Sequence, residues 1–435
     1  MNTAFGRLSI VNGRLIDPAN GIDGQHDLHI ANGRVTGIDR APDGFVADRQ
    51  IDATGCVLMP GIVDLSARLR EPGQEYKATI VSETTAAARG GITTVIVPPD
   101  TDPVIDTPAV AELIRRRAKQ SARARVLTVG GLTTGLAGEQ LTEMAALKRV
   151  GCVAVSNAWH PLATTLVERR ALEYAATFDL PVFLHPQDHA LRDSGICHEG
   201  KVAARLGLPG IPEAAETVAV ARDLALAKHT GATIHFRGIS TGAAVQMIRS
   251  AQEQGMRVSA DVPAHQLHLT ETDVDGFDAQ CHVIPPLRTL EDRDALRAGV
   301  KDGTIGAICS DHQPHEPDAK LAPFPSTAPG ISGLETLLPL TLRLVQEGVL
   351  DLPTAISRLT TGPASITGLT LGHLGPGAWA DVCVFDPEHH WHFRQGDMTS
   401  CGSNTPFDRW DFTGRVTHTL FEGRLVFETS GQPDV

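Results

Sequence analysis

The middle of the chain alternates between short apolar runs and longer amphipathic stretches. Apolar residues recur at helical spacing in seven segments: 79–89, 109–118, 141–149, 164–177, 213–228, 243–254 and 290–298. Between such segments lie eight runs with the length and composition of buried strands: 57–65, 93–97, 126–129, 152–156, 182–185, 233–237, 257–262 and 305–310. Eight strand–helix repeats predict an α/β fold, a (β/α)8 TIM barrel. A doubly wound sheet is the alternative, but no GxGxxG motif follows the first run.

Both ends of the chain alternate between apolar and polar residues with the period of a strand. Asn-Gly turn signals at 12–13 and 32–33 separate short alternating runs near the N-terminus. Similar runs follow at 380–385 and 416–426. We therefore expect a small composite β-sandwich built from both termini. The expected division is 1–56 and 366–435 for this domain and 57–365 for the barrel.

Composition narrows the class of protein. The net charge of −13 repels phosphate backbones, so nucleic acid is not an expected partner. No basic segment and apolar run resembling a signal peptide opens the chain, and no apolar run approaches the roughly 18 residues of a membrane span. The seven cysteines form no CxxC pair, which favours reduced thiols and a cytoplasmic location.

Polar side chains follow the predicted strands, at the end of a barrel where active sites lie. Two segments are dense in metal-ligand residue types: Asp311-His312-Gln313-Pro314-His315 and His185-Pro186-Gln187-Asp188-His189. The other polar residues at strand ends are Ser66, Arg68, Arg70, Asp100, Asn157, Arg237 and His265. Ordinary loop polarity is the alternative interpretation.

These motifs resemble the dihydroorotases of the amidohydrolase superfamily. Residues 60–65 (PGIVDL) and 69–73 (LREPG) resemble the first strand and loop of that family, and 102–108 resembles its second-strand segment. Residues 285–288, 310–315 and 405–407 match further along the chain. The resemblance implies a barrel with a composite β-sandwich. It also implies hydrolysis of a cyclic amide by a metal-activated hydroxide.

The metal ligands that the resemblance implies are largely missing. The first-strand His-x-His of the family is represented by Ser66 and Arg68. Arginine cannot bind a metal, because its guanidinium stays protonated and offers no lone pair. The bridging ligand of the fourth strand corresponds to Asn157, and the sixth-strand histidine corresponds to Gly238, three residues after a retained His235.

Two ligand positions survive, and they are too few for a catalytic zinc. His185 on the fifth strand and Asp311 on the eighth match family ligands, and Asp311 also marks the catalytic base position. Three protein ligands are the usual minimum for catalytic zinc. We therefore expect no metal and no catalytic residue, and we expect Arg68 to take the vacant metal position and to pair with Asp311 or another acid at the barrel mouth.

Of the four substrate-binding positions that the resemblance implies, two keep the family residue and two do not. Arg70 and His315 are retained where the family holds the carboxylate end of its substrate. Asp100 replaces an asparagine there, and a carboxylate facing a carboxylate costs about 1 to 4 kcal/mol at 4 Å. Ile284 replaces a second asparagine and cannot form a hydrogen bond.

The degraded first-strand motif and the segment Gly-Leu-Pro-Gly-Ile-Pro-Glu at 207–213 resemble one branch of the family most closely. Its chains are non-catalytic partners of aspartate transcarbamoylase. The resemblance implies an inactive structural or regulatory subunit of that complex in pyrimidine biosynthesis. It further implies a hetero-oligomer with the transcarbamoylase catalytic chain, a dodecamer of six catalytic and six inactive chains.

Two other interpretations remain open at this stage. The first is an active zinc-dependent dihydroorotase, converting dihydroorotate and water to N-carbamoyl-L-aspartate, with unusual ligands drawn from His160, His189, His198 and His265. The second is an inactive pocket that binds a metabolite through Arg70 and His315. The histidines within 389–392 are expected in a surface loop, and residues 316–329 resemble a lid.

Overall fold

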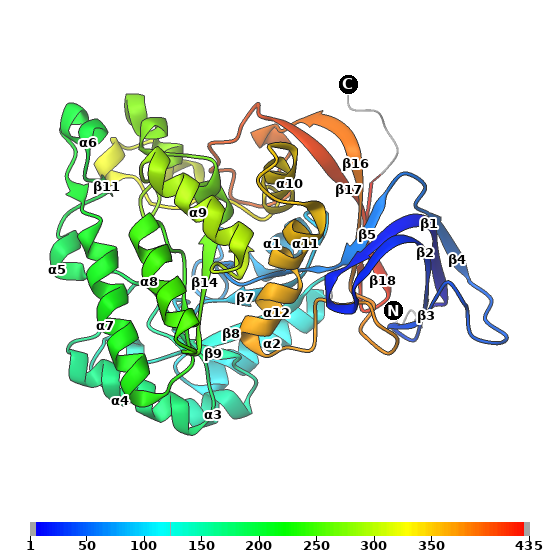
Figure 1. The fold of residues 1–435 in the computed structure, drawn as a ribbon, viewed down its shortest axis with the longest axis horizontal. Helices are drawn as coiled ribbons and strands as arrows, with labels where there is room; N and C mark the ends of the chain where they lie inside the picture. Colours follow the sequence, from blue (N-terminus) through cyan, green and yellow to red (C-terminus); the bar gives the residue numbers. More distant parts are fainter. Residues whose placement is uncertain (1–5, 122, 430–435) are drawn as a thin grey trace.

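Eight short apolar segments form the parallel strands of a barrel, as the alternation predicts (Figure 1). The structure is a computed structural model that describes residues 6–121 and 123–429. The strands are β6 (Ile62–Asp64), β7 (Ile92–Val97), β8 (Arg125–Gly131), β9 (Ala154–Ser156), β10 (Val182–Leu184), β13 (Ile234–Phe236), β14 (Val258–Pro263) and β15 (Ala307–Cys309). Beyond β6 and β15 the barrel closes through Ala67 and His312, and the amide of Arg68 donates to the carbonyl of His312 at 2.9 Å.

Helices surround the barrel, and the sequence predicted seven of them. These are α1 (Ile80–Arg89), α2 (Pro108–Ser121), α3 (Met144–Arg149), α4 (Thr165–Thr177), α7 (Ala214–Thr230), α8 (Gly242–Glu253) and α9 (Leu290–Asp302). Threonine side chains cap several of them; Thr79 accepts from the amide of Ser82 at 3.1 Å at the start of α1.

The sequence pattern did not predict the remaining α-helices. They are α10 (Leu337–Gln346), α11 (Leu352–Leu359), α12 (Thr361–Thr367) and the short α5 (His189–Arg192) and α6 (Lys201–Leu206). Seven of the ten residues of helix α10 are buried, and only Thr341, Arg343 and Gln346 are polar. Two short strands, β11 (Cys197–His198) and β12 (Gly210–Ile211), pair in the excursion after β10.

Both ends of the chain meet in one mostly antiparallel sheet beside the barrel (Figure 1). Its strands are β1 (Leu8–Asp17), β2 (Ile22–Ala31), β3 (Arg34–Ile38), β4 (Arg49–Asp52), β5 (Val57–Pro60), β16 (Val382–His392), β17 (Asp411–Phe421) and β18 (Arg424–Glu428). They follow the order β18-β17-β16-β5-β1-β2-β3, with β4 also beside β1. Apolar residues from both termini share one core, including Leu15 and Val384.

Two expectations about these strands were wrong. The run at 57–65 is not one barrel strand: β5 pairs with β1 and β16 in the terminal sheet, and only β6 belongs to the barrel. The chain crosses between them at Gly61, where a Cβ atom would lie 2.1 Å from Oγ1 of Thr93. Residues 389–392 form the end of β16 rather than a loop, because β17 continues alongside and pairs with them.

Arg125 at the start of β8 joins the barrel to the terminal sheet. Its guanidinium contacts the carboxylates of Asp381 at 2.6 Å and Glu422 at 3.2 Å. Burial raises the pKa of Asp381, and Arg125 opposes that rise. These ion pairs therefore hold the N-terminal end of strand β8 against the terminal sheet.

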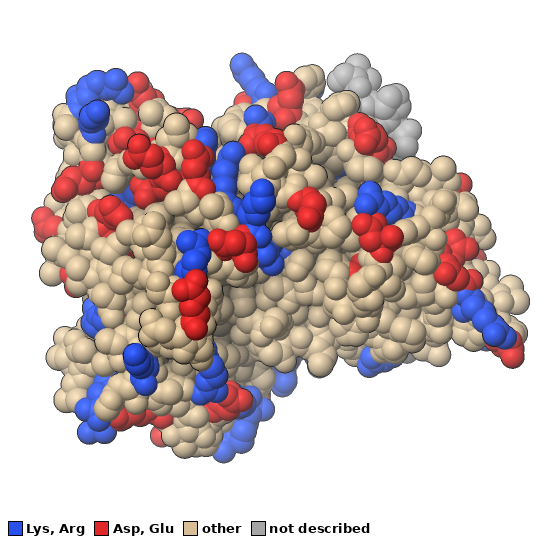
Figure 2. Space-filling view, viewed as in Figure 1, with Lys and Arg blue, Asp and Glu red and all other residues tan. Residues whose placement is uncertain are grey.

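Charged side chains of both signs are interspersed over the helices on the face shown in Figure 2. Within residues 6–121 and 123–429, no helix is long and apolar enough to cross a membrane.

Candidate active site

Arg68 lies at the barrel mouth between two carboxylates. Its side chain is 6% exposed, its Nε donates to Oδ2 of Asp100 at 2.9 Å, and its Nη1 lies 3.6 Å from Oδ1 of Asp311. The guanidinium also lies over the ring of Trp159, 4.5 Å from its centroid. The expected pairing of Arg68 with Asp311 or another acid is confirmed, and Asp100 is the nearer partner.

Asp311 is enclosed by groups of the chain itself. Oγ of Ser66 donates to its Oδ1 at 3.0 Å, and Nε2 of Gln313 donates to its Oδ2 at 2.9 Å. Nη2 of Arg237 donates to Oγ of Ser66 and lies 4.0 Å from Oδ1 of Asp311. Both carboxylate oxygens are therefore engaged. The sequence placed Arg237 at a strand end but gave no sign that it would contact this acid.

The electrostatics of the two carboxylates differ. Burial raises the pKa of Asp311, although Arg68 and Arg237 oppose the rise. Burial also acts on Asp100, but the charge and hydrogen bond of Arg68 outweigh it, so its pKa is lowered. Asp100 is thus an ion-pair partner of Arg68. The replacement of the family's asparagine by Asp100 did not predict this role.

The residues at the other expected ligand positions form hydrogen bonds within the protein. The amide oxygen of Asn157 accepts from Oγ1 of Thr133 at 2.6 Å, and its nitrogen donates to the carbonyls of Leu136 and His160. The backbone amide of Gly238 donates to Asp261 at 2.6 Å.

His235 contacts two residues of the neighbouring strand β14. Its Nε2 lies 3.0 Å from Oδ2 of Asp261, and its Nδ1 lies 2.9 Å from Oγ of Ser259. The retained histidine of the sixth-strand motif is therefore committed to internal hydrogen bonds.

His185 faces the barrel mouth beside Trp159, with ring centroids 6.1 Å apart. Its Nε2 is buried and has no hydrogen-bond partner among the described residues. Burial and the charge of Arg237 lower the pKa of His185 to about 3, so the imidazole is neutral.

Little space remains at the mouth. A cavity of about 10 Å³ is lined by Trp159, His185, Arg237, Asp261, Ile284 and Asp311, among others. One water molecule needs about that much. Within residues 6–121 and 123–429, no three His, Cys, Asp or Glu side chains are placed to hold a metal ion. The donor set present does not fit the metal centre that the fold implies.

The retained substrate positions bind each other. Nε of Arg70 donates to the carbonyl of Pro314 at 3.0 Å, and its Nη2 lies 3.3 Å from Nε2 of His315. Nζ of Lys77 approaches Nδ1 of His315 at 3.1 Å. Burial and the neighbouring charges of Arg70 and Lys77 lower the pKa of His315 to about 3. Ile284 packs against Ile211 in a small apolar cluster.

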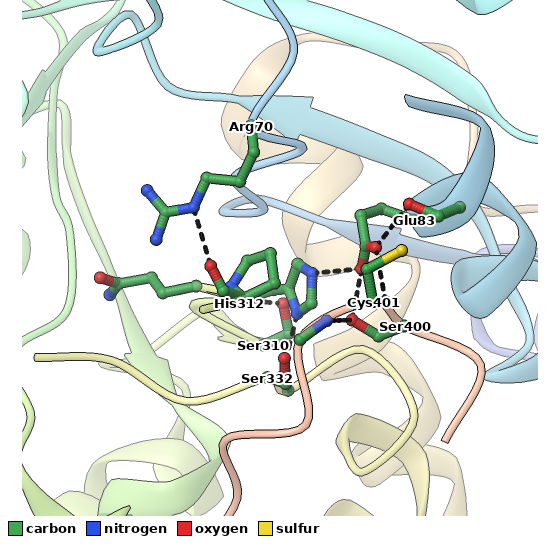
Figure 3. A network of polar contacts seen from close by, with 12 residues as sticks. Arg70, Glu83, Ser310, His312, Ser332, Ser400 and Cys401 are labelled. Atoms are coloured by element: carbon green, nitrogen blue, oxygen red, sulfur yellow. Dashed lines mark hydrogen bonds and ion pairs between the residues drawn. The ribbon is translucent and has the colours of Figure 1, made fainter. Parts of the chain in front are cut away.

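His312 points away from the mouth, although it belongs to the segment richest in ligand types (Figure 3). Its Nε2 lies 2.8 Å from Oε2 of Glu83 on α1, and its Nδ1 accepts from the amide of Gly333 at 3.1 Å. Oγ of Ser400 and the amide of Cys401 also donate to Glu83. These hydrogen bonds join the segment after β15, where the barrel closes, to α1 and to residues 400–401. The role of His312 is therefore structural. Nothing in the sequence pattern of α1 marked Glu83.

Comparisons with known proteins agree with this architecture. The sequence model of the Dihydro-orotase-like family matches residues 55–243. A protein of Pseudomonas putida named "Dihydroorotase-like protein" is 50% identical over 96% of this chain and 98% of its own length. The chain belongs to the dihydroorotase-like family. A protein of Syntrophotalea carbinolica named "Dihydroorotase" is 45% identical to this dihydroorotase-like chain, over 98% of the chain and 100% of that protein.

Solved structures confirm the fold of this dihydroorotase-like protein. The L-hydantoinase (dihydropyrimidinase) of Arthrobacter aurescens superimposes with a TM-score of 0.86 at 25% identity, covering 97% of this chain and 96% of that one. A D-hydantoinase from Thermus sp. gives a TM-score of 0.83 at 19% identity, covering 97% and 95%. The amidohydrolase barrel predicted from the sequence is thereby confirmed, and the expected composite β-sandwich domain is present as one mostly antiparallel sheet built from both termini.

Proposed function

We propose that this dihydroorotase-like protein is a catalytically inactive member of its family. The proposed role is that of a structural or regulatory, non-catalytic subunit of an aspartate transcarbamoylase complex, acting in the cytoplasm in pyrimidine biosynthesis. The observation that carries the loss of catalysis is the pairing of Arg68 with Asp100 and Asp311. A guanidinium cannot replace a Lewis acid, because it supplies positive charge but no vacant coordination position.

The state of the other site residues supports the same proposal. The oxygens of Asp311 are engaged by Ser66 and Gln313, so the carboxylate is not free to accept a proton from an attacking water. Arg70 and His315 bind each other at the place where a substrate carboxylate would need them. The remaining cavity of about 10 Å³ is far smaller than a cyclic amide substrate requires.

Turnover and metal content test the loss of catalysis. The purified protein should open dihydroorotate no faster than buffer does, and it should carry far less than one zinc per chain after dialysis. Turnover together with stoichiometric zinc would reject the proposal.

Co-expression tests the partner. The proposal expects the chain to co-elute with an aspartate transcarbamoylase catalytic chain of the same organism, at a mass well above that of either chain alone. The partner follows from the branch of the family that the first-strand motif resembles. Separate elution of the two chains at micromolar concentration would reject this part of the proposal and leave the loss of catalysis standing.

A second candidate function is an active zinc-dependent dihydroorotase. The observation that favours it is that relatives 42–45% identical over nearly the whole chain carry the name "Dihydroorotase". His265 is one of its candidate ligands, and its Nε2 is buried without a partner among the described residues. Zinc-dependent turnover that is lost in His265→Gln would favour this candidate over the first.

A further inference from the structure

We propose that Arg68 and Arg237 exclude a divalent cation from ligands that the chain still carries. The inference rests on the proposed loss of hydrolase chemistry and names the side chains that enforce it. Four side chains of ligand type, His185, Asp261, Cys309 and Asp311, line one cavity together with Arg237. The chain therefore retains part of a metal-binding set, and guanidinium groups fill the space among its members.

Charge is the first reason why a cation is excluded. Arg68 lies 3.6 Å and Arg237 lies 4.0 Å from Oδ1 of Asp311, so two fixed positive charges already face this carboxylate. Both side chains are more than nine-tenths buried, where repulsion between like charges is weakly screened. A cation at the same carboxylate would have to approach both guanidiniums.

Unused hydrogen-bond donors give the second reason. Nε of Arg237 and both terminal nitrogens of Arg68 are buried and have no hydrogen-bond partner among the described residues. These N–H groups are left over after Asp100, Asp311 and Ser66 have been satisfied. Buried donors without acceptors are costly, which indicates that the arginines are held for their charge at this place.

Space is the third reason. The cavity has room for about one water molecule, and the side chain of Arg237 forms part of its wall. Truncation of Arg237 would open a volume bordered by His185, Asp261 and Asp311. One imidazole and two carboxylates are a ligand set that divalent transition metals accept, but both oxygens of Asp261 now bond to His235 and Gly238, so the ion would have to displace those contacts.

The experiment compares Co²⁺ binding by the wild-type chain, Arg237→Ala and Arg68→Ala/Arg237→Ala. Calorimetry gives affinity and stoichiometry, and the visible absorption of Co²⁺ reports protein ligands directly. We expect the arginine variants to bind one Co²⁺ per chain at least about tenfold more tightly than the wild-type chain does. Their melting temperature should rise on addition of Co²⁺ because the ion binds only the folded state.

Controls tie the gain to this site. Adding Asp311→Asn to Arg237→Ala should abolish the gain, and Arg169→Ala, an exposed arginine on α4, should not produce it. If Arg237→Ala does not fold, Arg68→Met provides the test, since it keeps the aliphatic stem over Trp159 and removes the charge. Folded arginine variants that bind Co²⁺ no better than the wild-type chain would overturn the inference. Turnover by the wild-type protein would instead overturn the proposed function.

Discussion

At the scale of single residues, one substitution changes the chemistry of the barrel mouth. Arg68 cannot act as a ligand, and it brings a permanent charge that the surroundings must neutralise. Asp100 and Asp311 do so from two different strand ends, and Trp159 covers the guanidinium. The barrel mouth thereby holds a set of internal ion pairs.

Removal of Arg68 should be strongly destabilising. Arg68→Ala leaves two acids at the mouth without their main counter-charge, and breaking a buried ion pair from one side costs about 3–5 kcal/mol. Urea unfolding measures the loss. In the double variant Arg68→Ala/Asp100→Asn part of the stability should return, because the uncompensated charge at position 100 is gone. Strictly additive free energies of unfolding would show that the two side chains are not coupled.

At the scale of elements, the buried pair of Glu83 and His312 joins three segments that are distant in sequence. Helix α1 supplies Glu83, the segment after β15 supplies His312, and Ser400 and Cys401 donate from the C-terminal part. Burial opposes ionisation of Glu83, but hydrogen bonds from His312 and Ser400 outweigh it and lower its pKa. The carboxylate is thus retained as a multiple acceptor.

Glu83→Gln tests this connection. The amide has one acceptor oxygen in place of two and sets its own donors against those of Ser400 and Cys401, so we expect a loss of about 1–3 kcal/mol in the free energy of unfolding. Glu112→Gln on the exposed face of α2 is the matched control and should change stability by less than about 0.5 kcal/mol. Equal effects of the two substitutions would contradict the structural role of Glu83.

At the scale of the whole molecule, buried neutral histidines couple stability to pH, while burial raises the pKa of Asp64 to about 7 and acts in the opposite direction. Burial is the main cause in every case, lowering the pKa of His185, His265 and His315 to about 3 and that of His198, His268 and His282 to about 4. In the unfolded chain these groups titrate near 6.5. Unfolding below that pH therefore takes up protons.

Stability should consequently be full above about pH 6.5 and fall as the pH drops toward 4, because each folded pKa lies below its unfolded value. Each histidine contributes up to about 1.4 kcal/mol per pH unit in that window. Urea unfolding between pH 5 and pH 7 should show a smaller slope for His265→Gln than for the wild-type chain. His229→Gln, at the exposed end of α7, should leave the slope unchanged. An unchanged slope for both variants would show that burial of His265 does not set this dependence.

The sequence by itself determined the barrel, the terminal sheet and the residue types that stand at the ligand positions of the family. Periodicity is a local property, so strands and amphipathic helices could be predicted from adjacent residues. The unsuitability of Arg68 as a ligand is intrinsic to its side chain and needs no coordinates. The mostly apolar α10 and the division of 57–65 between two sheets were missed because local pattern does not show which neighbour a segment packs against.

Only the tertiary structure decided how the mouth is closed. Arg68 and Asp100 are 32 residues apart, and Ser66 and Asp311 are 245 apart, so their contacts depend on closure of the barrel. The role of Arg237 and the inward orientation of His312 arose in the same way. Residue type limits what chemistry a side chain can perform, whereas the fold determines which other side chains it contacts.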